Sequence, residues 1–162
     1  MYSLHYGNLF KLGDSYFVME KLQSIEYLII HHSNRNFDSP FLIEIRHRFL
    51  RGWDSVGYHY FIGNGVLTKK GKVYEGQSEE YEGYHVFGKN HNSLGVCLIG
   101  NFDFNSPSKE QMEGLKKLLK EKMQKYNIDP DKIQGHREFG KTDKSCPGKM
   151  VNLDELREEL RL

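Results

Sequence analysis

Two adjacent histidines end an apolar run near the start of the sequence, in the stretch YLIIHHSN. The run has the length of a buried strand, and successive side chains of a strand point to its opposite faces. We therefore expect His31 and His32 on opposite faces, so that at most one of them ligates a metal. A single histidine at a strand end is more often a hydrogen-bonded structural residue than a ligand. Other candidate ligands are needed to decide between these interpretations.

Such candidates occur near the other end of the chain, in the segment GHREFGKTDKSCPG. His136 is expected to end a short strand, and Cys146 follows ten residues later in a loop that contains glycine and proline. This loop could fold a thiolate back towards an imidazole. With one histidine of the first pair, these two residues would give three ligands and one open tetrahedral position, as in a catalytic zinc site. A structural zinc would need a fourth ligand, for which His59, His85 and His91 are candidates.

The chain contains only two cysteines, which are too few for the disulfide framework of a small secreted domain. Cys97 lies inside the apolar stretch LGVCLIG, where a small buried thiol is ordinary, and we interpret it as a core residue. The alternatives to a ligand role for Cys146 are a free loop thiol and a bridge to Cys97. Cysteine usage favours a reducing compartment at synthesis.

The segments that must position these side chains alternate between strands and helices. Strands are expected at 26–32, 57–63, 72–76, 94–100 and 132–138. The second and third of them flank a turn and should form an antiparallel ribbon. The fourth is almost continuously apolar, as in a central strand that is buried on both faces.

Three helices are expected between and after these strands. The first follows Ser39 and ends at Gly52, and its apolar residues at helical spacing are Leu42, Ile45, Phe49 and Leu50. The second covers 108–126 and begins with a capping box of Ser108 and Gln111. The third covers 152–160 with Asn152 as its N-cap. This alternation predicts an α/β fold of three layers, with a central mixed β-sheet covered by helices on both faces.

Composition limits the classes of protein that need to be considered. A chain of 162 residues without repeats or linker-like tracts is expected to form one domain, 1–162. Acidic and basic residues nearly cancel, 22 against 23, so no nucleic-acid or anionic-membrane partner is expected. The sequence shows no export signal and no long apolar segment. We expect a soluble monomer that is cytoplasmic at synthesis.

Four motifs in order, LIIHHSN, VGYHYFI, GYHVFGKNHNSLGVCLIGNF and GHRE followed by KSCPG, carry a resemblance to a known family. The chain resembles the zinc-dependent N-acetylmuramoyl-L-alanine amidases of the bacteriophage-lysozyme and peptidoglycan-recognition-protein type. The likeness runs from about residue 27 to residue 146 and covers roughly three quarters of the chain. Residues 1–24 precede this family core, and no separate cell-wall-binding domain is recognisable.

The resemblance implies a site, residue by residue. Its zinc ligands would be His31, His136 and Cys146, with His32 as a supporting residue on the opposite face. The family's catalytic tyrosine corresponds to Tyr58, and the catalytic lysine of the phage-lysozyme branch corresponds to Lys144. His85 and Asn92 correspond to substrate-groove positions, and Ser93 stands beside them at the entry to the central strand.

The activity implied is hydrolysis of the amide bond between N-acetylmuramic acid and L-alanine in peptidoglycan. Zn²⁺ would activate water, and Tyr58 and Lys144 would stabilise the oxyanion. In showing no export signal, the chain resembles a phage endolysin that reaches the cell wall after release. A recycling amidase or an exported effector would look similar. Two other classes of protein stay open. One is a non-catalytic peptidoglycan-binding module, and the presence of Cys146 argues against it. The other is a regulatory protein that binds an RNA polymerase.

Overall fold

A mixed five-stranded β-sheet forms the centre of the computed structural model, which describes residues 11–12, 15–16, 19–139 and 145–162. The strand order is β5-β4-β6-β3-β7. The strands are β3 (Tyr27–His32), β4 (Tyr60–Ile62), β5 (Val73–Glu75), β6 (Ser93–Leu98) and β7 (Ile133–Gly135). Only β5 runs antiparallel to its neighbour, so the predicted ribbon of β4 and β5 is confirmed. The apolar strand β6 lies third of five, in the middle of the sheet as predicted.

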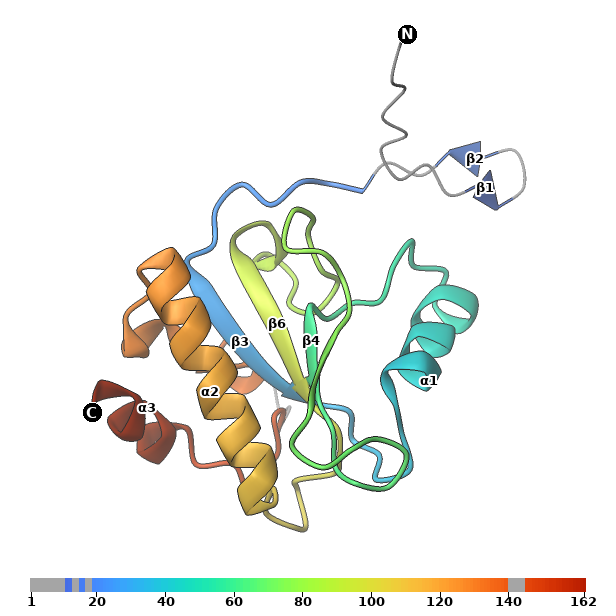
Figure 1. The fold of residues 1–162 in the computed structure, drawn as a ribbon. Coiled ribbons are helices and arrows are strands. Elements are labelled where there is room, and N and C mark those ends of the chain that lie inside the picture. The colour runs from blue at the N-terminus through green and yellow to red at the C-terminus, as the bar shows by residue number, and fades with distance from the viewer. Residues whose placement is uncertain (1–10, 13–14, 17–18, 140–144) are drawn as a thin grey trace, which may run out of the picture.

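Helices cover both faces of this sheet (Figure 1). On one face lie α2 (Lys109–Tyr126) and α3 (Leu153–Arg161), which pack against Leu28 and Ile30 of β3. On the other face lies α1 (Pro40–Ile45), whose Ile43 packs with Phe61 and Cys97. The three-layer α/β prediction is therefore confirmed, and Cys97 is a core residue with a fully buried side chain.

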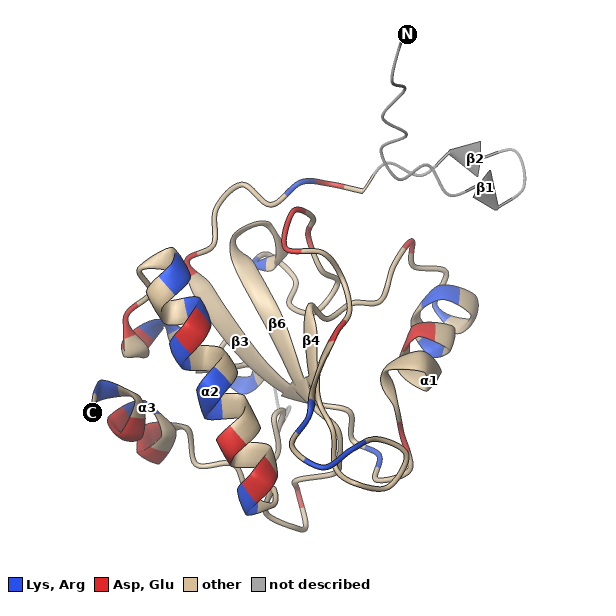
Figure 2. Ribbon diagram, viewed as in Figure 1, with Lys and Arg blue, Asp and Glu red and all other residues tan. Residues whose placement is uncertain are grey.

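Charged residues are distributed as this layering requires. Figure 2 shows acidic and basic residues along α2, whereas β3, β4 and β6 carry none. A strand in the middle of a sheet covered on both faces has no solvated side on which a charge could lie, because burying an unpaired charge is costly. No helix among the described residues has the length and apolar character to cross a membrane.

The predicted caps of α2 and α3 are both present. The Ser108 hydroxyl accepts from the Gln111 backbone N–H, and the Gln111 side chain accepts in return from the Ser108 N–H. Asn152 caps α3 by accepting from the Glu155 N–H. Each cap satisfies a backbone donor that the first helical turn leaves without a partner. These signals are local, which is why the sequence predicted the starts of both helices.

The first helix differs from its prediction in its buried face. Ser39 caps α1 as expected, but the α-helix ends at Ile45 and continues as a π-helical turn from Arg46 to Leu50. The buried residues are Ile43 and His47, whereas Phe49 and Leu50, part of the predicted apolar stripe, are exposed. The wider π turn rotates the residues that follow it, so helical spacing did not predict the face that packs on the sheet.

The residues before β3 lie against two loops of the core. The Leu22 N–H donates to the Glu80 carbonyl, and the Gln23 N–H donates to the His91 carbonyl. Further back, the short strands β1 (Lys11–Leu12) and β2 (Ser15–Tyr16) pair with each other in antiparallel fashion. The segment immediately before β3 is thus attached to the core by its backbone.

Candidate metal centre and active site

Three side chains from distant parts of the chain meet at the end of β3. His31 is the last but one residue of that strand, His136 directly follows β7, and Cys146 lies in the loop before α3. One ligand atom from each of them lies within 4.8 Å of the others. His31 is buried, and the other two are partly exposed. The cluster is therefore anchored in the sheet and accessible from one side.

The spacing within the cluster suits a zinc ion. The Sγ of Cys146 lies 3.6 Å from the Nδ1 of His31. Tetrahedral zinc with ordinary Zn–N and Zn–S bond lengths holds such ligand atoms about 3.3–3.6 Å apart. Two imidazoles and a thiolate are ligands that zinc prefers, and three protein ligands leave one position open. The donor set and the spacing of this pair thus fit a catalytic zinc site.

The second histidine of the opening pair faces away from this cluster, as strand alternation predicted. The Nδ1 of His32 accepts a hydrogen bond of 3.2 Å from the Phe102 N–H, and the two rings pack at 6.2 Å. Burial lowers the pKa of His32, against an opposing effect of Asp103. A neutral ring is what this acceptor role requires.

Two of the histidines considered as a fourth ligand have both ring nitrogens engaged elsewhere. The Nδ1 of His59 accepts from the Gly95 N–H, and its Nε2 donates to the Tyr81 carbonyl. Burial lowers the pKa of His59 to about 4, so the ring is neutral. His85 contacts His31 through one nitrogen and Ser93 through the other. Among the described residues, the metal-binding group contains the three predicted ligands alone.

Tyr58 lies beside the cluster, just before β4 rather than within it. Its ring packs against three others, those of His31 at 5.0 Å, His47 at 5.5 Å and Phe61 at 5.8 Å. Burial, followed by the proximity of the Cys97 and Cys146 thiols, raises the pKa of Tyr58 well above its usual value. The phenol therefore stays protonated at neutral pH and is able to donate a hydrogen bond next to the candidate metal.

The other predicted site residues have different surroundings. His85 is buried behind His31, and Asn92 is buried in the loop before β6. The Nδ2 of Asn92 donates to Glu26, while its Oδ1 has no hydrogen-bond partner among the described residues. Lys144 lies outside the described residues. The substrate-binding assignments of His85 and Asn92, and the catalytic assignment of Lys144, stay predictions.

Arg137, which was not among the residues predicted from the sequence, holds the loop of Cys146. Its guanidinium donates to the carbonyls of Ser145, Gly148 and Val151 at 3.3, 2.7 and 2.8 Å. Its backbone N–H donates to the Cys146 carbonyl at 2.8 Å. Arg137, which directly follows the candidate ligand His136, thus holds the loop that carries the candidate ligand Cys146. A signal for this contact was present in the sequence. An arginine has several hydrogen-bond donors, and Arg137 adjoins an irregular loop whose backbone carbonyls need donors.

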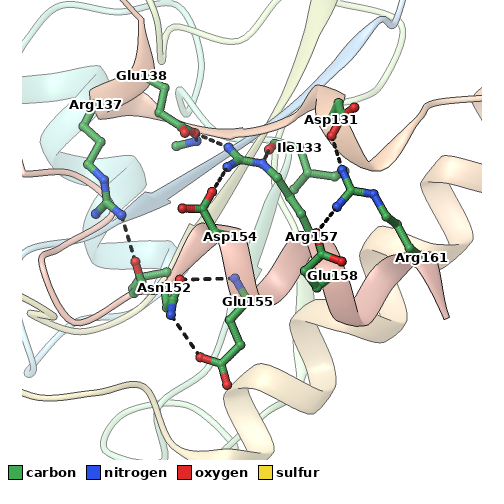
Figure 3. A network of polar contacts seen from close by, with 12 residues as sticks. Asp131, Ile133, Arg137, Glu138, Asn152, Asp154, Glu155, Arg157, Glu158 and Arg161 are labelled. Atoms are coloured by element: carbon green, nitrogen blue, oxygen red, sulfur yellow. Dashed lines mark hydrogen bonds and ion pairs between the residues drawn. The ribbon is translucent and has the colours of Figure 1, made fainter.

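A second arginine, Arg157, holds the segment from Ile133 to Glu138 (Figure 3). Arg157 of α3 donates from Nε to the Ile133 carbonyl at 2.8 Å and also pairs with Glu138. Glu138 in turn accepts from the Gly135 N–H at 2.7 Å. The short strand β7 and the turn after it are therefore fastened to α3 on either side of His136.

Replacing Arg137 by alanine is expected to destabilise the metal-free chain by about 1–3 kcal/mol, because it leaves partly buried carbonyls without their donor. Arg161→Ala is the matched control, since this arginine pairs with Asp131 and Glu158 at the surface of α3, where ion pairs contribute about 0–1 kcal/mol. Urea denaturation of both variants with the metal removed measures the difference. Equal stability of the two variants would contradict the role assigned to Arg137.

The fold and the site together define a class of protein. It is a three-layer α/β protein in which a central strand, the turn after an edge strand and a C-terminal loop bring two histidines and a cysteine together beside a tyrosine. The family model described as N-acetylmuramoyl-L-alanine amidase matches residues 21–149. The chain belongs to this family.

Individual relatives agree with this assignment. Peptidoglycan-recognition protein 2 of Holotrichia diomphalia is 34% identical over 143 residues, which are 83% of this chain and 73% of that protein. The endolysin of Escherichia phage T7 is 34% identical over 102 residues, 60% of this chain and 62% of that protein. The solved structure of N-acetylmuramoyl-L-alanine amidase LysC from Clostridium intestinale is 28% identical with a TM-score of 0.80, over 90% of this chain and 91% of that one.

Proposed function

We propose that this protein is a zinc-dependent N-acetylmuramoyl-L-alanine amidase that hydrolyses the bond between N-acetylmuramic acid and L-alanine in peptidoglycan. The observation that carries the proposal is the cluster of His31, His136 and Cys146 with Tyr58 against it. A bound zinc ion supplies an activated water nucleophile and a Lewis acid for the amide carbonyl. The family and the amidase and endolysin relatives support the same activity.

The side chains of the site have two roles, which are to bind the metal and to stabilise the negative charge that develops during hydrolysis. His31, His136 and Cys146 would hold the ion, and three protein ligands would leave a coordination position for water. Water adds to the lactyl carbonyl, the C–N bond breaks, and the products are a lactyl carboxylate and the free amine of L-alanine. Negative charge develops on the carbonyl oxygen, where a hydrogen-bond donor or a cation is most effective. We assign this role to the phenol of Tyr58, whose ring lies 5.0 Å from that of His31, and to the ammonium of Lys144.

The second candidate function is recognition of peptidoglycan without cleavage. It is favoured by the relatives named peptidoglycan-recognition proteins, which include the one with 34% identity over most of this chain. The cluster argues for catalysis instead, because recognition of a glycan and a peptide needs no cysteine sulfur held 3.6 Å from an imidazole nitrogen. Peptidoglycan is the partner in both cases.

Digestion of purified peptidoglycan separates the two functions. We expect wild-type protein to release stem peptides with a free L-alanine amine and to leave the glycan strands intact, as seen by mass analysis. A chelator should stop the release, and added zinc should restore it. Cys146→Ser is the matched control, since it keeps the side-chain size and weakens a soft ligand. New reducing sugar ends, or binding without any new amine, would refute the amidase proposal.

We assign the protein the biological role of a phage-type endolysin that is made in the cytoplasm and acts on the cell wall after release. The similarity to the endolysin of phage T7 supports this role. Expression inside a bacterial host tests it: the cells should lyse only when the inner membrane is also permeabilised. Lysis without permeabilisation would contradict the need for a separate release step.

A further inference from the structure

The two ring nitrogens of His31 face different neighbours. Its Nδ1 lies on the side of Cys146, whereas its Nε2 lies 3.1 Å from the Nδ1 of His85. The two imidazole planes are perpendicular, with ring centroids 5.2 Å apart. A neutral imidazole has one nitrogen that carries a proton and one with a free lone pair. Only the nitrogen with the lone pair ligates a metal, so the position of the proton on His31 matters for the proposed zinc site.

The hydrogen bonds behind His85 determine where that proton lies. The Ser93 hydroxyl is 2.6 Å from the Lys89 carbonyl, and since a carbonyl only accepts, the hydroxyl proton is committed to it. The same Ser93 oxygen lies 3.4 Å from the Nε2 of His85. Because its proton is already donated to Lys89, this oxygen can only accept a hydrogen bond from that nitrogen. His85 therefore carries its proton on Nε2, and its Nδ1 accepts from the Nε2–H of His31.

We propose that His85 and Ser93 are positioning residues of the metal centre, which hold the proton of His31 on Nε2 and keep the Nδ1 lone pair directed at the metal position. A metal-ligating histidine commonly donates its other N–H to a carboxylate or a backbone carbonyl, which orients the ring. Here the acceptor is a second histidine, whose own tautomer is set by a serine. The inference rests on the proposed zinc site, and it adds the two residues that orient the ligand His31.

The surroundings of His85 leave its ring little freedom to break this chain. The Oδ1 of Asn90 accepts from the backbone N–H groups of His85 and Val86, at 3.0 and 2.9 Å. The ring lies on Gly95 of β6, where an added Cβ would come within 2.8 Å of the imidazole carbon. Ser93 is fully buried at the start of the same strand. One strand thus supplies both the serine and the flat surface on which the ring rests.

Nuclear magnetic resonance of the ring nitrogens in the metal-free chain tests the proton position directly. We expect the Nε2 atom of His31 and the Nε2 atom of His85 each to carry a proton, and the Nδ1 atom of each ring to carry none. A proton on Nδ1 of either ring would overturn the proposal. This measurement does not depend on zinc binding or on hydrolysis, so it separates failure of the hydrogen-bond chain from failure of the proposed function.

Zinc affinity tests the consequence. Ser93→Ala should bind zinc more weakly than wild type, by up to about the 10- to 100-fold that is usually lost when the direct partner of a ligand is removed, because Ser93 acts through His85. Ser55→Ala is the matched control, because Ser55 is also buried but its hydroxyl bonds to Val56 and Gln77. Competition with a chromophoric chelator measures both affinities. Equal affinities in the two variants would overturn the proposal.

A pair of substitutions at His85 distinguishes the hydrogen bond from simple packing. His85→Gln retains a side-chain oxygen that can accept from His31, whereas His85→Phe fills the space without an acceptor. The glutamine variant should bind zinc more tightly than the phenylalanine variant, and its Co²⁺ form should keep the absorption band of the thiolate ligand. If the phenylalanine variant binds zinc at least as well, His85 acts by packing alone and the proposal fails.

Discussion

His31→Ala is expected to lose zinc and amidase activity together, whereas His32→Ala should keep close to one zinc per chain. His31 is one of three ligands at a position fixed by β3, and no other described histidine is placed to replace it. His32 lies on the opposite face, where it accepts from the Phe102 N–H. Its removal leaves that donor without a partner and should cost about 1–3 kcal/mol of stability.

Metal analysis, hydrolysis kinetics and urea denaturation on the same preparations separate these outcomes. The expected pattern is a variant at position 31 that folds and lacks zinc, and a variant at position 32 that holds zinc and unfolds at lower urea. Loss of zinc in His32→Ala with zinc retained in His31→Ala would mean that the assignment of faces is wrong. Loss of the fold in both would be visible in the denaturation curves of the metal-free proteins.

Lys144→Ala is expected to lower the turnover number by about 10²- to 10³-fold, the usual loss for one donor to a developing oxyanion, with a small change in KM. Zinc content should not change, because a protonated ammonium has no lone pair with which to ligate a metal. Tyr58→Phe should retain zinc and also slow turnover. The phenylalanine ring keeps the packing against His47 and Phe61 and loses only the hydroxyl.

Zinc content and kinetics measured on the two variants show which donor carries more of the catalysis. If both act on the same oxygen, the double variant should lose less than the product of the two single effects, because donors that act as a unit are not additive. Turnover close to that of wild type in Lys144→Ala would remove this lysine from the mechanism. A loss of zinc in Tyr58→Phe would instead show that the hydroxyl supports a ligand.

Much of the fold could be predicted from local patterns. The apolar run of β6 indicated a central strand, and the caps at Ser108 and Asn152 marked where α2 and α3 begin, because each depends on residues within a few positions of one another. The α1 segment was predicted less well. Its apolar residues fit a regular helix, but a π turn after Ile45 leaves Phe49 and Leu50 exposed and buries His47.

The candidate metal ligands were named from the sequence, whereas the residues that hold them in place were not. Strand alternation indicated that at most one of His31 and His32 is a ligand, and the segment around His136 and Cys146 supplied the other candidates. The resemblance then selected His31, His136 and Cys146 as the set. An arginine beside an irregular loop was a signal that could have been noticed, but which carbonyls Arg137 would hold could not be predicted, because backbone carbonyls are the same in every residue. Likewise, the predicted strand around Tyr58 begins only at Tyr60, so this side chain is oriented by packing rather than by alternation.

The sequence by itself determined which chemical groups the protein possesses, in what order, and that the two histidines of β3 lie on opposite faces, since these depend on residue type and on the period of a strand. Only the tertiary structure decided which groups meet. His31 and His85 are separated by 54 positions and His31 and Cys146 by 115, yet each pair is in contact. Contacts at such separations arise from the parallel pairing of β3 with β6 and β7, which is set by burial of the whole sheet rather than by any short segment.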